Sequence, residues 1–309
     1  MVHVRTWSVL CLLLCACAVP MAQTSVPPAS PAADLWPRDR FPDGAPLALG
    51  NGPEDRPAIT PYLASGTDLH PAILVCPGGG YGFLANDHEG RAIGVWCQQH
   101  NISAFVLSYR IAPKYHHPCP MLDVQRALRT VRGRAMEWHV DAARIGVMGF
   151  SAGGHLASTA ATLFDAGNVD AVDPIDRQSC RPDFAVLVYP VITFDKPWAH
   201  QGSKHNLLGD QSDDAALVAR MSTANSVTKL TPPAFLLHTT LDQVVAAENS
   251  IDFYLALRRV SVPAELHIFE RGEHGFGLGG NDPVLSGWPD LLLDWLRVRG
   301  VTRKPVGAL

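Results

Sequence analysis

A serine lies between two glycines in the run Gly149-Phe150-Ser151-Ala152-Gly153. The apolar, partly β-branched residues 145–148 before it predict a strand, and small helix-forming residues follow it. A sharp turn between strand and helix would hold the serine in a strained conformation, which requires small residues two positions to either side. A hydroxyl presented in this way can act as a nucleophile when a base takes its proton.

This pattern resembles the nucleophile elbow of α/β-hydrolases, in which an acidic residue and then a histidine follow the serine along the chain. Among the later histidines, His274 stands apart because it lies in a glycine-rich loop just past the last predicted strand. Such a loop can bring the imidazole over Ser151 as a general base. We expect a structural role for His155, and buried, hydrogen-bonded positions within strands for His238 and His267.

The acidic partner is expected between Ser151 and His274, on a loop at the same edge of the sheet. Asp242 is the preferred candidate because it follows the predicted strand 234–239 closely. Its role would be to hold the imidazole in one tautomer and to stabilise the imidazolium. Asp195, which follows another apolar run, is the alternative.

Three consecutive glycines follow an early apolar strand in the run Cys76-Pro77-Gly78-Gly79-Gly80-Tyr81. Without a Cβ, their backbone can approach a tetrahedral intermediate closely. We therefore predict an oxyanion hole formed by the N–H groups of Gly79, Gly80 and Ala152, the last being the residue after the nucleophile. A phosphate-binding loop is the alternative, but the GxxxxGK[ST] pattern and a nearby lysine are missing.

Along the rest of the chain, apolar runs of strand length alternate with helical patterns. The predicted strands are 72–76, 104–109, 145–148, 184–189, 234–239 and 264–269. The predicted helices are 90–100, 124–138, 248–259 and 288–299. Fully apolar strands interleaved with helices predict an α/β fold of the α/β-hydrolase type, with a mostly parallel central sheet and helices on both faces. Residues 191–229 break the alternation and predict a short cap-like insertion, with a surface excursion as the alternative.

The N-terminal region predicts export. The apolar run Val9–Val19 follows basic residues and is too short to span a bilayer comfortably, which is typical of a secretory signal peptide. We assign residues 1–22 to this signal, with cleavage after Ala18 or Ala22. Lipid attachment at Cys17 is the alternative. The protein is therefore expected to be secreted or periplasmic, or else lipid-anchored at the envelope, and no other membrane contact is predicted.

Composition sets further bounds on the chain. A Pro/Ala/Ser-rich tether (23–33) is followed by one predicted catalytic domain (34–303), and 309 residues that are 47% hydrophobic suffice for one sizeable core. The net charge of −4 without a basic run gives no electrostatic reason to expect a nucleic-acid partner. No CxxC pair or zinc-ligand spacing occurs, and no metal or cofactor is predicted. The sequence leaves open how the later cysteines pair: Cys76, Cys97, Cys119 and Cys180.

Further motifs resemble a family of bacterial secreted α/β-hydrolases labelled acetyl xylan esterase or xylanase-associated esterase, which is similar to the feruloyl-esterase-like group. The resemblance covers roughly residues 34–300, and its motifs are Pro77-Gly78-Gly79-Gly80-Tyr81, Asp87-His88-Glu89-Gly90, Ser108-Tyr109-Arg110-Ile111-Ala112-Pro113, the elbow 149–157, Val245-Ala246-Ala247-Glu248-Asn249-Ser250 and Glu273-His274-Gly275-Phe276-Gly277. It implies hydrolysis of carboxylic esters, with removal of acetyl groups from plant-wall polysaccharide as the expected reaction. It places the nucleophile, acid and base on Ser151, Asp242 and His274.

Two residues depart from the patterns of related families. Leu241 stands where a second aspartate is common, and Pro77 replaces the histidine that opens the HGGG loop of hormone-sensitive-lipase relatives. For the substrate we single out Tyr81 and Trp198 as residues that could line a sugar-facing cleft. The sequence does not name the acyl group or the alcohol. The alternatives are a feruloyl or general small-ester esterase, a prolyl-oligopeptidase-like peptidase, and a catalytically idle carbohydrate-binding scaffold.

Overall fold

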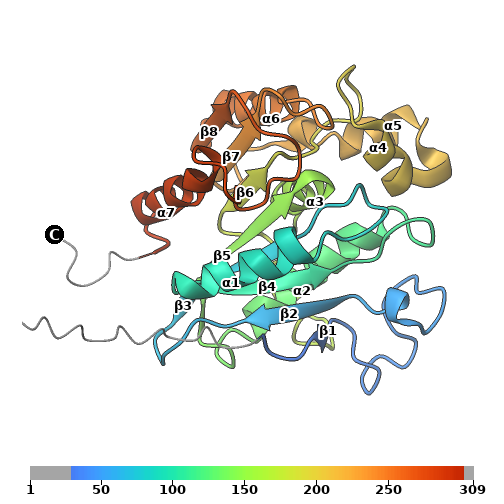
Figure 1. Ribbon diagram of the computed structural model, residues 1–309. Coiled ribbons are helices and arrows are strands. Elements are labelled where there is room, and N and C mark those ends of the chain that lie inside the picture. The colour runs from blue at the N-terminus through green and yellow to red at the C-terminus, as the bar shows by residue number, and fades with distance from the viewer. Residues whose placement is uncertain (1–28, 303–309) are drawn as a thin grey trace, which may run out of the picture.

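The computed structural model describes residues 29–302, and within them the chain forms one eight-stranded sheet (Figure 1). The strands lie in the order β1-β2-β4-β3-β5-β6-β7-β8. Their bounds are β1 Ala33–Asp34, β2 Ala58–Tyr62, β3 His70–Cys76, β4 Ser103–Ser108, β5 Val140–Phe150, β6 Ala185–Val188, β7 Ala234–Thr239 and β8 Ala264–Phe269. β2 pairs antiparallel with both of its neighbours, β1 and β4, and every neighbouring pair from β4 to β8 is parallel.

Helices cover both faces of the sheet. The α-helices are α1 Ala92–Gln99, α2 Cys119–Gly133, α3 Ser151–Thr162, α4 Gln201–Leu208, α5 Ala215–Met221, α6 Glu248–Arg259 and α7 Trp288–Val298. Shorter helical turns are Pro53–Asp55, Asp87–Arg91 (a π-helical turn), Gly209–Gln211, Thr223–Ser226 and Leu285–Gly287. Apolar residues of α1 and α7 pack on one face, whereas those of α2, α3 and α6 pack on the other.

The alternation of side chains along β3 shows why its sequence is apolar throughout. Ile73 and Val75 join the cluster that contains α1 and α7, whereas Leu74 and Cys76 join the cluster that contains α2 and α3. A parallel strand that is buried on both faces needs apolar residues at every position. The predicted mostly parallel central sheet with helices on both faces is therefore confirmed.

Several boundaries differ from the predictions, and the strand predicted at 145–148 extends over Val140–Phe150. The helix predicted to reach residue 138 ends at Gly133, although Ala135 and Trp138 remain buried in the turns that lead to β5. At the N-terminal end, the last residues of the predicted tether pair with the sheet: Ser30 N–H donates to Pro61 O, and Ala33 lies opposite Ile59. Backbone pairing to the edge of β2 holds these last residues in place despite their Pro/Ala/Ser composition. The predicted signal segment lies outside the described residues.

The cysteines of the domain carry no disulfide in the structure. Cys76, Cys97, Cys119 and Cys180 are all buried and free. Burial raises the pKa of the Cys76 and Cys97 thiols, because an apolar environment disfavours the thiolate. Among residues 29–302, no helix is long and apolar enough to cross a membrane.

The segment between Val191 and Lys229 folds into α4 and α5 with short helical turns, beyond the carboxyl ends of the central strands (Figure 1). It is tied to α3 by His155, whose Nε2–H donates to Met221 O over 2.7 Å while its Nδ1 accepts from Tyr81 O–H over 2.8 Å. His155 is completely buried, so the structural role predicted for it agrees with its contacts.

This histidine gives a pH-dependent stability. Burial lowers the pKa of His155 to about 4 from an ordinary 6.5, because the protonated ring is disfavoured there. The contribution of neutral His155 to the free energy of unfolding is therefore fully present above pH 6.5 and is lost as the pH falls towards 4. We expect the unfolding free energy to drop in this window by up to about 1.4 kcal/mol per pH unit more in the wild type than in His155→Gln. Urea unfolding at a series of pH values measures this, and parallel slopes would contradict it.

Candidate active site

Five loops that could carry chemistry meet at one edge of the sheet. They follow β3, β5, β6, β7 and β8, which are parallel neighbours in the sheet. The carboxyl ends of parallel strands meet at one edge, where α/β proteins form their binding crevices. The loops carry, in chain order, the three glycines, Ser151, Tyr189, Asp242 and His274.

Ser151 occupies the strained turn that its sequence predicts. It has a φ of +52°, between the end of β5 and the first turn of α3. A Cβ at Gly149 would lie 2.1 Å from Gly153 O, and a Cβ at Gly153 would lie 2.1 Å from Cys76 O. These contacts are with backbone atoms, which cannot rotate away. The two glycines are therefore required by close packing of the elbow against itself and against the end of β3.

We expect Gly153→Ala to lower the free energy of unfolding by about 3 kcal/mol or more, because overpacking against backbone must displace β3 or the elbow. Thermal unfolding and soluble yield measure this. Gly287→Ala is the matched control, since a Cβ there meets nothing within 4 Å and its φ is −85°. Wild-type stability of the Gly153 variant would show that the elbow can relax.

The structure brings Ser151, His274 and Asp242 together in one hydrogen-bonded chain. His274 Nε2 lies 2.8 Å from Ser151 Oγ, and His274 Nδ1 lies 2.6 Å from Asp242 Oδ2. The carboxylate can only accept, so Nδ1 carries the proton and Nε2 is left free to accept the serine proton. This is the arrangement in which an imidazole can act as a general base towards a hydroxyl.

Asp242 is held by more than its histidine partner. The N–H groups of Val244 and Val245 donate to its Oδ1 over 2.9 and 2.8 Å. Burial alone would raise the pKa of this carboxyl, but His238, His274 and the Val245 N–H hold the pKa well below its usual range. Asp242 therefore stays ionised at neutral pH while it faces the imidazole.

The glycine loop lies beside the serine. Gly79 and Gly80 have φ values of +121° and +63°, and both line the cavity beside Ser151. A Cβ at Gly79 would lie 2.2 Å from Phe83 O, so the tight loop requires glycine there. The N–H of Ala152 belongs to the first turn of α3, where it has no partner within the helix. Gly78 N–H, in contrast, is engaged, because it donates to Glu89 Oε2 over 2.8 Å.

The motif after β4 holds the glycine loop in place. Tyr109 O–H donates to Pro77 O over 2.7 Å, and Ala112 N–H donates to Tyr81 O over 2.9 Å. Arg110 forms a fully buried, bidentate ion pair with Asp123 of α2 over 2.6 to 3.1 Å. These contacts give a physical reason for a motif that the sequence alone offers only as a resemblance.

A cavity of about 480 Å³ opens in front of Ser151. This volume lies within the usual range for small-molecule sites. The α4 region contributes His200, Gly202 and Asn206 to its wall, so the predicted cap-like insertion does cover the site. Other lining residues are Gly79, Gly80, Gly82, Phe83, Ala85, His88, Glu89, Ser151, Val244, His274 and Gly275. Within residues 29–302, no cluster of three or more His, Cys, Asp or Glu could hold a metal ion.

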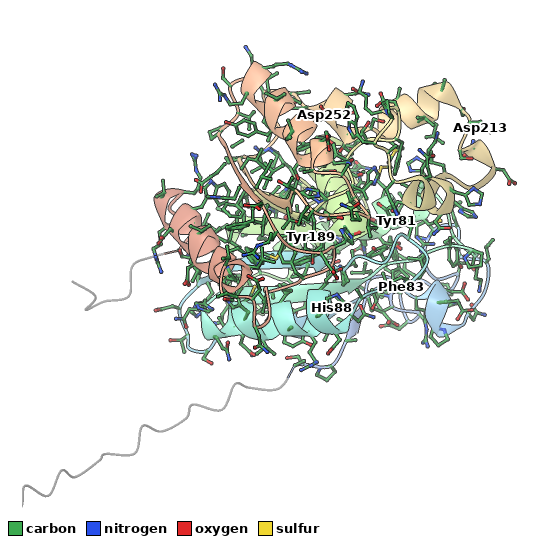
Figure 2. The ribbon with its side chains drawn as sticks, turned by 45° about the horizontal axis from the view of Figure 1, so that its top comes forward. Tyr81, Phe83, His88, Tyr189, Asp213 and Asp252 are labelled. Atoms are coloured by element: carbon green, nitrogen blue, oxygen red, sulfur yellow. The ribbon has the colours of Figure 1, made fainter. Side chains whose placement is uncertain are left out.

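The two residues predicted to contact a sugar do not line this cavity. Tyr81 is 1% exposed because its hydroxyl is turned inward onto His155, and the Trp198 indole donates to Asp252 of α6 over 3.2 Å. The exposed aromatic ring at the cavity is Phe83, which is 64% exposed and is labelled with Tyr81 in Figure 2. Phe83 lies two positions after Tyr81 in the same loop.

The remaining candidates fall outside the hydrogen-bonded chain. Asp195 accepts from Thr193 O–H and Asn225 N–H instead of from His274. His238 is completely buried and bonded to Ser250 and Val245, as predicted for it.

The expectation that His267 is buried within its strand is wrong. Its side chain is 28% exposed, because β8 is the last strand of the sheet and one of its sides stays open. His267 Nε2 lies 2.7 Å from Glu265 Oε1.

The fold and this site together define an α/β-hydrolase with serine, histidine and aspartate at the carboxyl edge of the sheet. The chain matches the BD-FAE family over residues 62–257, which is more than half of its length. It belongs to the BD-FAE family.

Two curated relatives carry names that refer to xylan. An acetylxylan esterase of Xylanibacter ruminicola is 38% identical over 211 residues, covering 67% of this chain and 41% of that protein. An endo-1,4-beta-xylanase B of Butyrivibrio fibrisolvens is 36% identical over 235 residues, covering 75% and 36%. The chain thus spans about two fifths of the length of these curated relatives.

A solved structure matches over its whole length. The acetyl ester-xyloside bifunctional hydrolase from Caldicellulosiruptor lactoaceticus is 42% identical, with a TM-score of 0.83, and the match covers 91% of this chain and 100% of that one. An α/β-hydrolase from a deep-sea metagenome, MGS-M1, is 28% identical with a TM-score of 0.60, covering 78% and 92%. Both share the fold described above.

Proposed function

We propose that the protein is a serine carboxylesterase that removes short acyl groups, acetyl above all, from carbohydrates such as acetylated xylan. The observation that carries the chemistry is the unbroken chain from Ser151 Oγ through His274 to Asp242 beside a glycine loop. The names of the acetylxylan esterase and acetyl ester-xyloside hydrolase relatives support the choice of acyl group and of alcohol.

In this mechanism, His274 Nε2 takes the proton of Ser151 while Oγ attacks the ester carbonyl carbon. The resulting oxyanion accepts hydrogen bonds from Gly79, Gly80 and Ala152 N–H. When it collapses, the bond between the carbonyl carbon and the alcohol oxygen breaks, and His274 returns the proton to that oxygen. Water then repeats the sequence on the acyl-serine and releases the carboxylic acid, so that the enzyme is regenerated.

The cavity supports a small acyl group with a larger, partly exposed alcohol. Glycines line the cavity together with Ser151, whereas Phe83 and His88, both labelled in Figure 2, line it with side chains that are more than half exposed. The exposed Phe83 ring offers a flat apolar surface of the kind on which a sugar ring can pack.

The test is acetate release from acetylated xylan by purified protein, with p-nitrophenyl acetate assayed in parallel and Ser151→Ala as the control. Release that disappears in the variant supports both the chemistry and the polysaccharide. Activity on p-nitrophenyl acetate alone would retain the esterase and redirect the substrate search to feruloyl or other small esters. Inactivity on both, together with no labelling by a fluorophosphonate, would favour an idle carbohydrate-binding scaffold.

We also propose that the chain is exported to the periplasm or the medium, on the basis of the apolar run Val9–Val19 after basic residues. Cell fractionation and mass spectrometry of the processed N-terminus test this. A mature chain that begins after residue 18 or 22 supports signal cleavage, whereas a lipid-modified Cys17 supports anchoring at the envelope. An intact N-terminus in the cytoplasm would contradict export.

A further inference from the structure

Glu89 is a buried carboxylate that the proposed mechanism does not use. It lies in the π-helical turn Asp87–Arg91, its side chain is 3% exposed, and it lines the cavity beside Ser151. Taking a carboxylate out of water costs several kcal/mol unless donors replace the lost solvation. Turns with π-helical bonding occur frequently at functional sites. Both features indicate that the hydrogen-bond partners of this carboxylate matter for the site.

One of its oxygens holds the glycine loop. Oε2 accepts from Gly78 N–H over 2.8 Å, directly before the two glycines assigned to the oxyanion hole. Gly78 is wedged in place, since a Cβ there would lie 2.6 Å from that oxygen and 2.9 Å from Ser151 Cβ. The hydrogen bond therefore fixes how far the loop stands from the nucleophile. It also withdraws Gly78 N–H from the set of possible oxyanion donors.

The other oxygen reaches the loop that carries the base. Oε1 accepts from Tyr189 O–H over 2.9 Å, and the same hydroxyl accepts from Gly277 N–H over 3.0 Å. The Tyr189 ring packs edge-on against His274, with 4.9 Å between ring centroids. Tyr189 is completely buried at the end of β6 with a φ of +37°, a strained conformation that the surrounding contacts must maintain.

We propose that Glu89 is a positioning residue that sets the oxyanion loop and the base loop relative to each other, through Gly78 on one side and Tyr189 with Gly277 on the other. This inference rests on the proposed esterase function. His88, whose Nε2 lies 3.7 Å from Oε1, is the adjacent group of opposite charge when it is protonated. One side chain thus contacts both halves of the machinery without touching the reacting atoms.

The test is steady-state kinetics of Glu89→Gln on p-nitrophenyl acetate, at a temperature well below the unfolding transition of each variant. Glutamine keeps the shape, but its NH₂ group cannot accept, so one of the two donors loses its partner. We expect kcat to fall on the order of 10²-fold with KM changed by less than about threefold, because misplacement by an ångström has that effect. The rate of fluorophosphonate labelling at Ser151 should fall in parallel.

Tyr189→Phe removes only the hydrogen bonds that link Glu89 to the loop of His274. It should lower kcat by about tenfold, since Gly277 N–H and Glu89 Oε1 each lose a partner. In the double variant the losses should not multiply, because both changes break the same chain. Asp87→Asn, at an exposed position in the same turn, is the matched control. If Glu89→Gln does not fold, the kcat of Tyr189→Phe alone tests the positioning role of Glu89.

Several results would overturn the proposal. These are a Glu89→Gln or Tyr189→Phe enzyme with kcat within about twofold of wild type, losses that multiply in the double variant, or a lowered melting temperature with unchanged kcat. A wild type that is inert to esters and to the fluorophosphonate is a different failure: it would reject the proposed function, and the role of Glu89 would be rejected with it.

Discussion

Ser151→Ala is expected to lower kcat for p-nitrophenyl acetate by a factor on the order of 10⁴–10⁶ and to abolish fluorophosphonate labelling. The substitution removes the one oxygen that can bond to the carbonyl carbon, so no acyl-enzyme can form. The hydroxyl contacts His274 Nε2, and alanine keeps the Cβ that the strained turn already accommodates at a φ of +52°. The melting temperature should therefore stay close to that of the wild type.

Ser65→Ala supplies the matched control. It makes the same chemical change at an exposed position between β2 and β3, away from the carboxyl edge of the sheet. Both kcat and labelling should equal those of the wild type. If Ser151→Ala retained turnover while the labelled residue mapped elsewhere, the nucleophile would have to be reassigned.

The sequence predicts the fold and the triad residues because their constraints are local. The elbow needs glycines where its own backbone crosses β3, and each parallel strand needs apolar residues on both faces. The order of residues along the chain then leaves few histidines and acids at the right edge. Asp242 and His274 emerge from that order, and the structure places them in contact.

The sequence does not predict which way a side chain points or which residues far away in the chain it contacts. Tyr81 and Phe83 are both aromatic residues of one loop, yet one hydroxyl turns inward to His155 and the other ring remains exposed. The hydrogen-bond partners of Glu89 lie 11 residues before it and 100 residues after it, so no local sequence pattern predicts them. The motif around Glu89 is visible in the sequence, but the role of Glu89 depends on tertiary contacts.

Asp242→Asn should fold but lose kcat on the order of 10³–10⁴-fold. Oδ1 of Asp242 accepts from two backbone N–H groups, Val244 and Val245, which only an oxygen can satisfy. In the asparagine variant the carbonyl oxygen must stay there, so the NH₂ group faces His274 Nδ1. That nitrogen must then accept, which moves the ring proton to Nε2. An Nε2–H directed at Ser151 cannot take the serine proton.

Because the loss comes from the wrong tautomer of His274, the expected signature is a lower kcat with KM nearly unchanged and an unfolding transition close to that of the wild type. Asp195→Asn is the paired variant, because Asp195 bonds to Thr193 and Asn225 and should retain full activity. If Asp195→Asn were inactive and Asp242→Asn active, the acid would be Asp195. Since His274 Nδ1 bonds to Asp242 Oδ2 and not to Asp195, this pair of variants is a direct test of the site.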